Sequence, residues 1–208
     1  VYGGYVLSYN GAKIINSGNN EVVYQKVLDP IMIPKLYEYA LEHKMGLVTY
    51  ETDCVITGTP IDKWMEFEAK INGLEIKYID NFVQYIDFPV NKCLLTAEGH
   101  LAEVATKELS DMFSGEANIF RSEPFFVEVM SVGIDKAASL DKLVKMLNIN
   151  IEDVIACGDG FNDISMIKYA GVGVAMANAQ DPVKDVADYV TLSNDEDGLV
   201  QVINKFIK

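Results

Sequence analysis

The sequence is short of basic residues: 17 Lys and Arg stand against 31 Asp and Glu, which gives a net charge of −14. A surface this acidic repels the phosphate backbone of nucleic acids and anionic lipid headgroups, so neither is expected as a partner. A site for a small anion remains compatible with this charge, because a bound metal ion reverses the sign of the local field.

Cysteines and long apolar runs are also scarce. The three cysteines, Cys54, Cys93 and Cys157, cannot all pair and do not show the spacing of metal ligands, which favours a reducing, cytoplasmic setting. No apolar run approaches the roughly 20 residues that cross a bilayer, and the first residues lack the pattern of a signal peptide. We therefore expect a cytoplasmic protein without a membrane partner, and the sequence does not indicate an oligomeric state.

Strand and helix patterns alternate regularly from residue 136 onward. The apolar run Val154–Cys157 is typical of a strand that is buried on both faces. Short connections between alternating strands and helices predict an α/β fold with a parallel sheet. The expected strands are 154–157, 172–176 and 189–192, and the expected helices begin near residues 136, 164, 181 and 199.

Residues 20–124 have a different pattern, which predicts an α+β block with antiparallel pairing. Helices are expected at 34–44, ended by Gly46, and at 98–113; strands are expected at 47–49, 92–95, 119–121 and 125–129. A single strand at residues 5–9 precedes this block. A domain inserted into the sheet of another domain explains this order, so we predict a core strand and hinge at 1–19, an inserted domain at 20–124 and the rest of the core at 125–208.

The stretch "ACGDGFND", residues 156–163, follows the predicted strand 154–157. Ligands of parallel sheets bind beyond the carboxyl ends of the strands, where Asp159 falls. Asn162 and Asp163 begin the next helix, whose free N–H groups favour an anion, and two nearby carboxylates suit a hard cation such as Mg²⁺. The same residue types are also ordinary in turns and helix caps, and spacing alone does not choose between the two interpretations.

Lys136 follows the polar turn "SVGID" and opens a predicted helix. A lysine in this place can offer a point charge to phosphate oxygens. The competing interpretation is a solvent-exposed surface lysine, which is the commoner case for a lysine considered by itself.

Taken together, these segments resemble a known family. "VGIDKAASLDKLVKMLNI", "EDVIACGDGFNDISMIKYAGVGVAMANA" and "ADYVTLSNDEDGLVQVI" are similar to the Cof-type branch of the haloacid dehalogenase-like phosphatases, and "YVLSYNGAKI" resembles the strand and hinge before its cap domain. The resemblance runs over nearly the whole chain and is strongest over residues 125–208. It implies a Rossmann-like core with a large inserted α+β cap, and Mg²⁺-dependent removal of phosphate from a small metabolite such as a sugar phosphate.

The resemblance also implies roles for individual residues. Asp159 would be a Mg²⁺ ligand, and Asp163 would support the metal directly or through water. Asn162 would contact the substrate phosphate, while Lys136 would neutralise phosphoryl charge and hold the nucleophile. Asn10-Gly11, in the hinge segment, would line the phosphate pocket.

The family's aspartate nucleophile, in a D-x-D motif that also supplies the acid and base, does not occur in this sequence. We expect about 50 further residues upstream, with an apolar strand that ends in D-x-D and lies beside strand 154–157. Asp195–Gly198 imitates the motif, but Leu199 stands where a hydroxyl is needed, and the family uses this stretch to cap its last helix. The 208-residue chain alone is therefore expected to be inactive.

Two other functions remain open. The chain could be a non-catalytic fragment or pseudo-enzyme that binds phosphate ligands, which an upstream sequence without D-x-D would indicate. It could also belong to a phosphomutase of the same superfamily, which would convert a sugar phosphate into its isomer instead of releasing phosphate.

Overall fold

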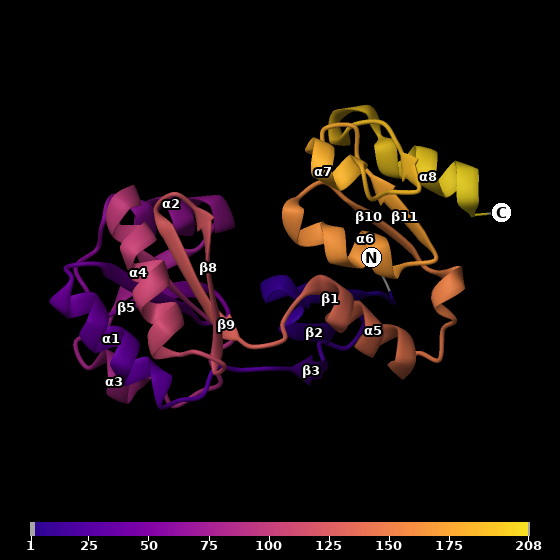
Figure 1. Cartoon of the computed structure of the whole chain (residues 1–208). Coiled ribbons are helices and arrows are strands. Elements are labelled where there is room, and N and C mark those ends of the chain that lie inside the picture. The colour runs from indigo at the N-terminus through magenta and orange to yellow at the C-terminus, as the bar shows by residue number, and fades with distance from the viewer. Residues whose placement is uncertain (1–2, 208) are drawn as a thin grey trace. The chain divides into compact units, whose positions relative to one another are not determined.

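The computed structural model describes residues 3–207, and the chain forms two compact units (Figure 1). The core unit consists of Val1–Tyr24 and Ile134–Lys208, and the inserted unit of Gln25–Gly133. The boundaries of the inserted unit thus lie at residues 25 and 133, whereas the prediction placed them at 20 and 124. Among the described residues, no helix is long and apolar enough to cross a membrane.

The inserted unit is built on one six-stranded sheet. In spatial order its strands are β6 (Glu75–Tyr78), β5 (Cys54–Thr57), β4 (Gly46–Tyr50), β7 (Lys92–Thr96), β9 (Phe126–Ser131) and β8 (Ala117–Glu123). β5 and β6 run parallel, and the other neighbouring pairs are antiparallel. Strand β9, predicted to belong to the core, pairs with β7 and β8, and this pairing moves the second boundary to residue 133.

Both faces of this sheet are covered, because successive side chains of a strand point to opposite faces. Leu95 packs with one buried cluster and its neighbour Leu94 with another. Helices α1 (Met32–Glu42), α3 (Phe82–Tyr85) and α4 (Gly99–Met112) contribute to the first cluster, and α2 (Lys63–Asn72) contributes to the second.

The end of α1 differs from the prediction that Gly46 would terminate it. The helix ends at Glu42, and Lys44 takes the left-handed conformation with φ 54°. Gly46 instead opens β4, where a Cβ atom would lie 2.1 Å from Oγ1 of Thr96. The glycine is therefore needed for close packing inside the sheet and not for ending the helix.

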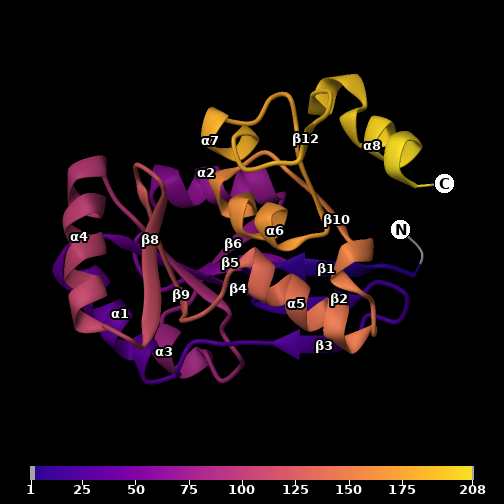
Figure 2. The ribbon, with the colours of Figure 1, turned by 45° about the vertical axis from the view of Figure 1, so that its right-hand side comes forward.

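The core unit contains two separate three-stranded sheets. The first consists of β1 (Tyr5–Ser8), β2 (Lys13–Asn16) and β3 (Val22–Gln25), and the second of β10 (Ile155–Gly158), β11 (Val172–Ala175) and β12 (Tyr189–Val190). Its helices are α5 (Lys136–Met146), α6 (Ile164–Tyr169), α7 (Asp181–Lys184) and α8 (Gly198–Phe206). The second sheet is parallel, as predicted. Helix α5 lies along the first sheet (Figure 2), with the Nζ atom of Lys142 4.9 Å from the centre of the Tyr24 ring.

Each sheet of the core unit has an edge strand that was expected inside a larger sheet. β1 pairs antiparallel with β2 and does not join the parallel sheet. Within residues 3–207, β10 pairs only with β11, and Ile155 and Cys157 are partly exposed. The expectation that this strand is buried on both faces is therefore wrong for the described chain, because Ile155 and Cys157, which share one face, are only partly buried.

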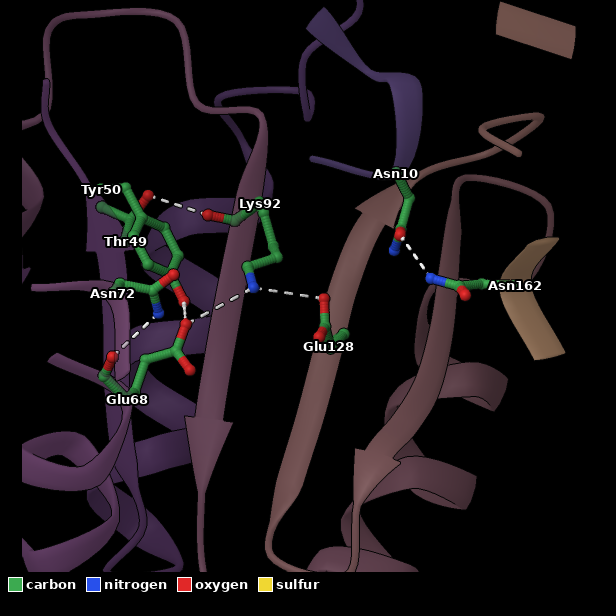
Figure 3. Close-up of polar contacts among 8 residues, drawn as sticks. All are labelled: Asn10, Thr49, Tyr50, Glu68, Asn72, Lys92, Glu128 and Asn162. Atoms are coloured by element: carbon green, nitrogen blue, oxygen red, sulfur yellow. Dashed lines mark hydrogen bonds and ion pairs between the residues drawn. The ribbon is translucent and has the colours of Figure 1, made fainter. Parts of the chain in front are cut away.

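A buried polar cluster lies on the inserted sheet at Lys92 (Figure 3). The Lys92 Nζ atom lies 3.8 Å from Oε1 of Glu68 and 3.4 Å from Oε2 of Glu128, and these three side chains are 14%, 8% and 11% exposed. The Tyr50 hydroxyl donates a 2.5 Å hydrogen bond to the same Glu68 oxygen. One ammonium group thus balances two carboxylates that are largely withdrawn from water.

We predict that Lys92→Met destabilises the inserted unit by about 3–5 kcal/mol, because removing one partner of a buried ion pair leaves an uncompensated charge. Lys63→Met is the matched control, since Lys63 pairs with Glu98 at 2.7 Å while both side chains are more than half exposed, 63% and 74%. The control should cost at most about 1 kcal/mol. Urea unfolding of both variants measures the difference, and equal losses would contradict the assignment.

Candidate active site

The loop after β10 folds around the carboxylate of Asp163. This side chain is 7% exposed, and its Oδ2 atom accepts hydrogen bonds from the backbone N–H groups of Asp159 and Gly160, each at 3.0 Å. A loop whose N–H groups would otherwise lack partners is thereby closed by one side chain at the start of α6.

The two glycines of the loop, Gly158 and Gly160, differ in how strictly the structure excludes a side chain at their positions. A Cβ atom on Gly158 would lie 2.4 Å from Cβ of Asp163, so a side chain here would collide with the buried aspartate. A Cβ atom on Gly160 would lie 2.7 Å from Oδ1 at the end of the Asn162 side chain and 3.6 Å from Oδ2 of Asp163, which is an ordinary contact distance. Gly158 is therefore required by the close approach of Asp163, whereas space at Gly160 depends on a flexible amide.

Lys136 and the loop come together although 27 positions separate Lys136 from Asp163. Lys136 is the first residue of α5, and Asp135 caps this helix by accepting a 2.9 Å hydrogen bond from the Ala138 N–H. The Lys136 ammonium donates to Oδ1 of Asp163. Burial raises the pKa of the Asp163 carboxyl, but the hydrogen bonds from Lys136, Gly160 and Asp159 outweigh it and lower this pKa overall.

The hinge segment lies against the same helix. Tyr9, Asn10 and Gly11 have φ values of 52°, 51° and 94°, a run of left-handed residues that only glycine adopts without strain. The carbonyl of Gly11 accepts a 2.7 Å hydrogen bond from the buried Ser139 hydroxyl. A Cβ atom on Gly11 would lie 2.1 Å from the Oγ atom of Ser139. Ser139 therefore anchors the hinge to α5, one turn after Lys136.

The side chains of Asn10, in the hinge segment, and Asn162, in the loop after β10, contact each other. The Asn162 Nδ2 atom donates to Oδ1 of Asn10 at 3.1 Å (Figure 3). A neighbouring cavity of about 370 Å³ is lined by Leu7, Asn10, Gly11, Lys136, Leu140 and Met166. The structure thus brings the predicted phosphate-binding residues into one region of the core unit.

Asp159 lies apart from this cavity lining and is exposed. Its Oδ2 atom accepts a 2.9 Å hydrogen bond from Nδ2 of Asn178. Sequence patterns do not indicate the roles of Asn178 and Ser139, because both act through contacts with residues distant in the chain.

The donor set fits a hard cation only in part. Among residues 3–207, no group of three or more His, Cys, Asp and Glu side chains could hold a metal ion. Both oxygens of Asp163 are engaged by Lys136 and the loop N–H groups, whereas Asp159 presents an exposed carboxylate at the end of a parallel strand. Carboxylate oxygen suits Mg²⁺, so Asp159 fits a direct ligand, and Asp163 fits a residue that shapes the loop around it.

The stretch that imitates the nucleophile motif forms the turn before α8. Glu196 accepts hydrogen bonds from the hydroxyl and the N–H of Ser193, at 2.7 and 3.3 Å. Asp197 precedes α8 with φ 56°, but its side chain makes no capping hydrogen bond. The expected turn is present with Asp197 at the N-cap position of α8, and Ser193 and Glu196 cap the 3₁₀ helix Asn194–Glu196 before it.

We predict that Gly158→Ala destabilises the core unit by about 1–3 kcal/mol, because the added methyl group collides with the buried Asp163. Gly160→Ala is the control from the same loop and should change the free energy of unfolding by about 0.5 kcal/mol or less, since the Asn162 amide can move aside. Thermal unfolding of both variants provides the comparison. A loss at Gly160 as large as at Gly158 would contradict this account of the loop.

Comparisons with known proteins identify the family of this chain. A family model described as haloacid dehalogenase-like hydrolase matches residues 2–203. "Putative phosphatase YxeH" of Bacillus subtilis is 31% identical over 99% of this chain and 76% of the relative. "5-amino-6-(5-phospho-D-ribitylamino)uracil phosphatase YcsE" of the same organism is 50% identical over 44% of this chain and 37% of the relative.

Solved structures give the same result. A crystal structure of a haloacid dehalogenase-like hydrolase from Bacteroides thetaiotaomicron is 44% identical, has a TM-score of 0.94, and is matched over 98% of this chain and 76% of that chain. The fold is thus shared with that structure over 98% of this chain. The chain belongs to the haloacid dehalogenase-like hydrolases, in their Cof-type branch.

Proposed function

We propose that the protein is a Mg²⁺-dependent phosphatase that hydrolyses a small phosphorylated metabolite, such as a sugar phosphate. The observation that carries this proposal is the pairing of Lys136 with the buried Asp163 carboxylate at the end of β10. This places a cation beside a loop and a helix start that suit an anion. The phosphatase names of the relatives YxeH and YcsE support the same reaction class.

In the proposed reaction, Lys136 binds a phosphoryl oxygen and balances the charge that develops on it. Asp163 holds the lysine in place, since its carboxylate is itself fixed by the loop N–H groups. The amides of Asn10 and Asn162, which bond to each other in the described structure, would donate hydrogen bonds to the other phosphate oxygens.

Asp159 would hold Mg²⁺ with its exposed carboxylate. When bound, the metal ion would supply positive charge that stabilises the transferring phosphoryl group. The loop N–H groups that bond to Asp163 keep Asp159 at the strand end, so Asp163 would support the metal through the loop.

The nucleophile is proposed to be an aspartate that lies outside these 208 residues. Three observations support this proposal. β1 and β10 each leave one edge unpaired among residues 3–207. The hydroxyl of Ser8, buried at the end of β1, has no hydrogen-bond partner in the described chain, and such a group costs about 1–3 kcal/mol. The chain also covers 76% of YxeH and not all of it.

A phosphate-release screen with the full-length protein tests the proposed function. Sugar phosphates, nucleotides, cofactor phosphates and 5-amino-6-(5-phospho-D-ribitylamino)uracil form a suitable panel, with and without Mg²⁺. Analysis of the products separates the alternatives, because a phosphomutase would yield an isomeric sugar phosphate. Binding of phosphate esters without turnover would favour a non-catalytic member.

We predict that Lys136→Met in the full-length protein lowers kcat by about 100-fold or more, because one preorganised charge on the transferring group is lost. Asp159→Asn should raise the Mg²⁺ concentration needed for half-maximal rate. Lys145→Met is the control on the same helix, since Lys145 is 74% exposed and forms an exposed surface ion pair with Asp141. Wild-type rates in both Lys136→Met and Asp159→Asn would refute these roles.

The 208-residue chain alone is predicted to show no Mg²⁺-dependent turnover of para-nitrophenyl phosphate, because it lacks the proposed nucleophile. The decisive comparison is with Asp197→Asn, which alters the stretch that imitates the nucleophile motif. Saturable phosphate release that disappears in Asp197→Asn would contradict the prediction and assign the nucleophile to Asp197.

A further inference from the structure

We propose that Asn178 is a positioning residue that fixes the carboxylate of Asp159 for a divalent cation and connects it to the turn before α8. This inference rests on the proposed function, since it assumes that Asp159 binds the metal. It adds a residue from a different loop to the site.

The loops that carry these residues leave neighbouring strand ends. Gly158, the last residue of β10, pairs with Ala175, the last residue of β11. The Met176 N–H continues this pairing with a 3.0 Å hydrogen bond to the Gly158 carbonyl. Asp159 follows one position after its strand and Asn178 three positions after its own, so the sheet brings both to one edge.

The contacts of Asn178 determine how its amide is oriented. Its Oδ1 atom accepts a 3.0 Å hydrogen bond from the backbone N–H of Asn194, and Nδ2 donates to Oδ2 of Asp159 at 2.9 Å. A backbone N–H can only donate, so the oxygen of the amide must face Asn194. The NH₂ group must then face the carboxylate. In the opposite orientation two donors would meet at Asn194 and two acceptors at Asp159, so neither contact could be a hydrogen bond.

This bridge matters because Asp159 is exposed and would otherwise change its side-chain rotamer freely. One carboxylate oxygen is held by the amide, which leaves the other oxygen to bind a cation. The far end of the bridge is stiff, since the hydroxyl of Ser193 bonds to Glu196 at 2.7 Å in the same turn. Partners that orient a metal ligand in this way typically change metal affinity by about 10–100-fold when removed.

The test measures Mn²⁺ binding to the full-length protein by electron paramagnetic resonance, with Mn²⁺ as a probe for the Mg²⁺ site. We expect Asn178→Ala to raise the Kd for Mn²⁺ by about 10–100-fold. Asn194→Pro is the matched variant, because it removes the backbone N–H that orients Asn178 and leaves the Asn178 side chain in place. Proline is tolerated at the first position of a helical turn, and Ser193 before it is extended, with φ −69° and ψ 169°. A smaller rise in Kd is expected for this variant.

Asp159→Ala separates the two proposals. Suppose that the wild type binds Mn²⁺ and that Asp159→Ala abolishes this binding. An unchanged Kd in Asn178→Ala would then overturn the role of Asn178, while the metal site at Asp159 would stand. If Mn²⁺ binding does not depend on Asp159, the proposed metal site fails and the inference fails with it. A purely structural role would lower the melting temperature without changing Kd. Should Asn178→Ala not fold, an unchanged Kd in Asn194→Pro overturns the inference.

Discussion

The burial of one carboxylate, that of Asp163, organises the candidate site. A buried carboxylate must be paired and hydrogen-bonded, because desolvation of an isolated charge costs far more than a fold can supply. Here the backbone N–H groups of Asp159 and Gly160 and the ammonium of Lys136 meet that requirement together. The closed loop, the absence of a side chain at Gly158 and the position of Lys136 all follow from this constraint.

The same constraint distinguishes the two aspartates of the motif, Asp159 and Asp163. A carboxylate whose oxygens are already occupied is a poor direct ligand for a metal ion, whereas exposed Asp159 is available for one. The motif therefore divides its two aspartates by environment: the buried one holds the loop and the lysine, and the exposed one faces solvent at the strand end. Two chemically identical side chains acquire different roles because one of them is desolvated.

The inserted unit uses buried charge for a different purpose. Lys92 connects Glu68 on α2 with Glu128 on β9, so the cluster ties a helix to the sheet that it covers. The two units also differ in how fully their strands are buried. Strands of the inserted sheet such as β4, β5 and β9 are buried almost throughout, whereas β10 of the core unit has partly exposed side chains and one unpaired edge within residues 3–207.

The sequence by itself determined the family, the alternation of strands and helices after residue 136, and the candidate residues at 136 and 159–163. These are local properties, since periodicity and motif spacing are written along the chain. The tertiary structure decided where the units divide, because strand pairing assigns β9 to the inserted sheet. It also decided the roles of Gly46, Ser139 and Asn178, whose contacts lie with Thr96, Gly11 and Asp159. Such roles cannot be predicted from sequence patterns, because they depend on distances between segments that only the folded chain brings together.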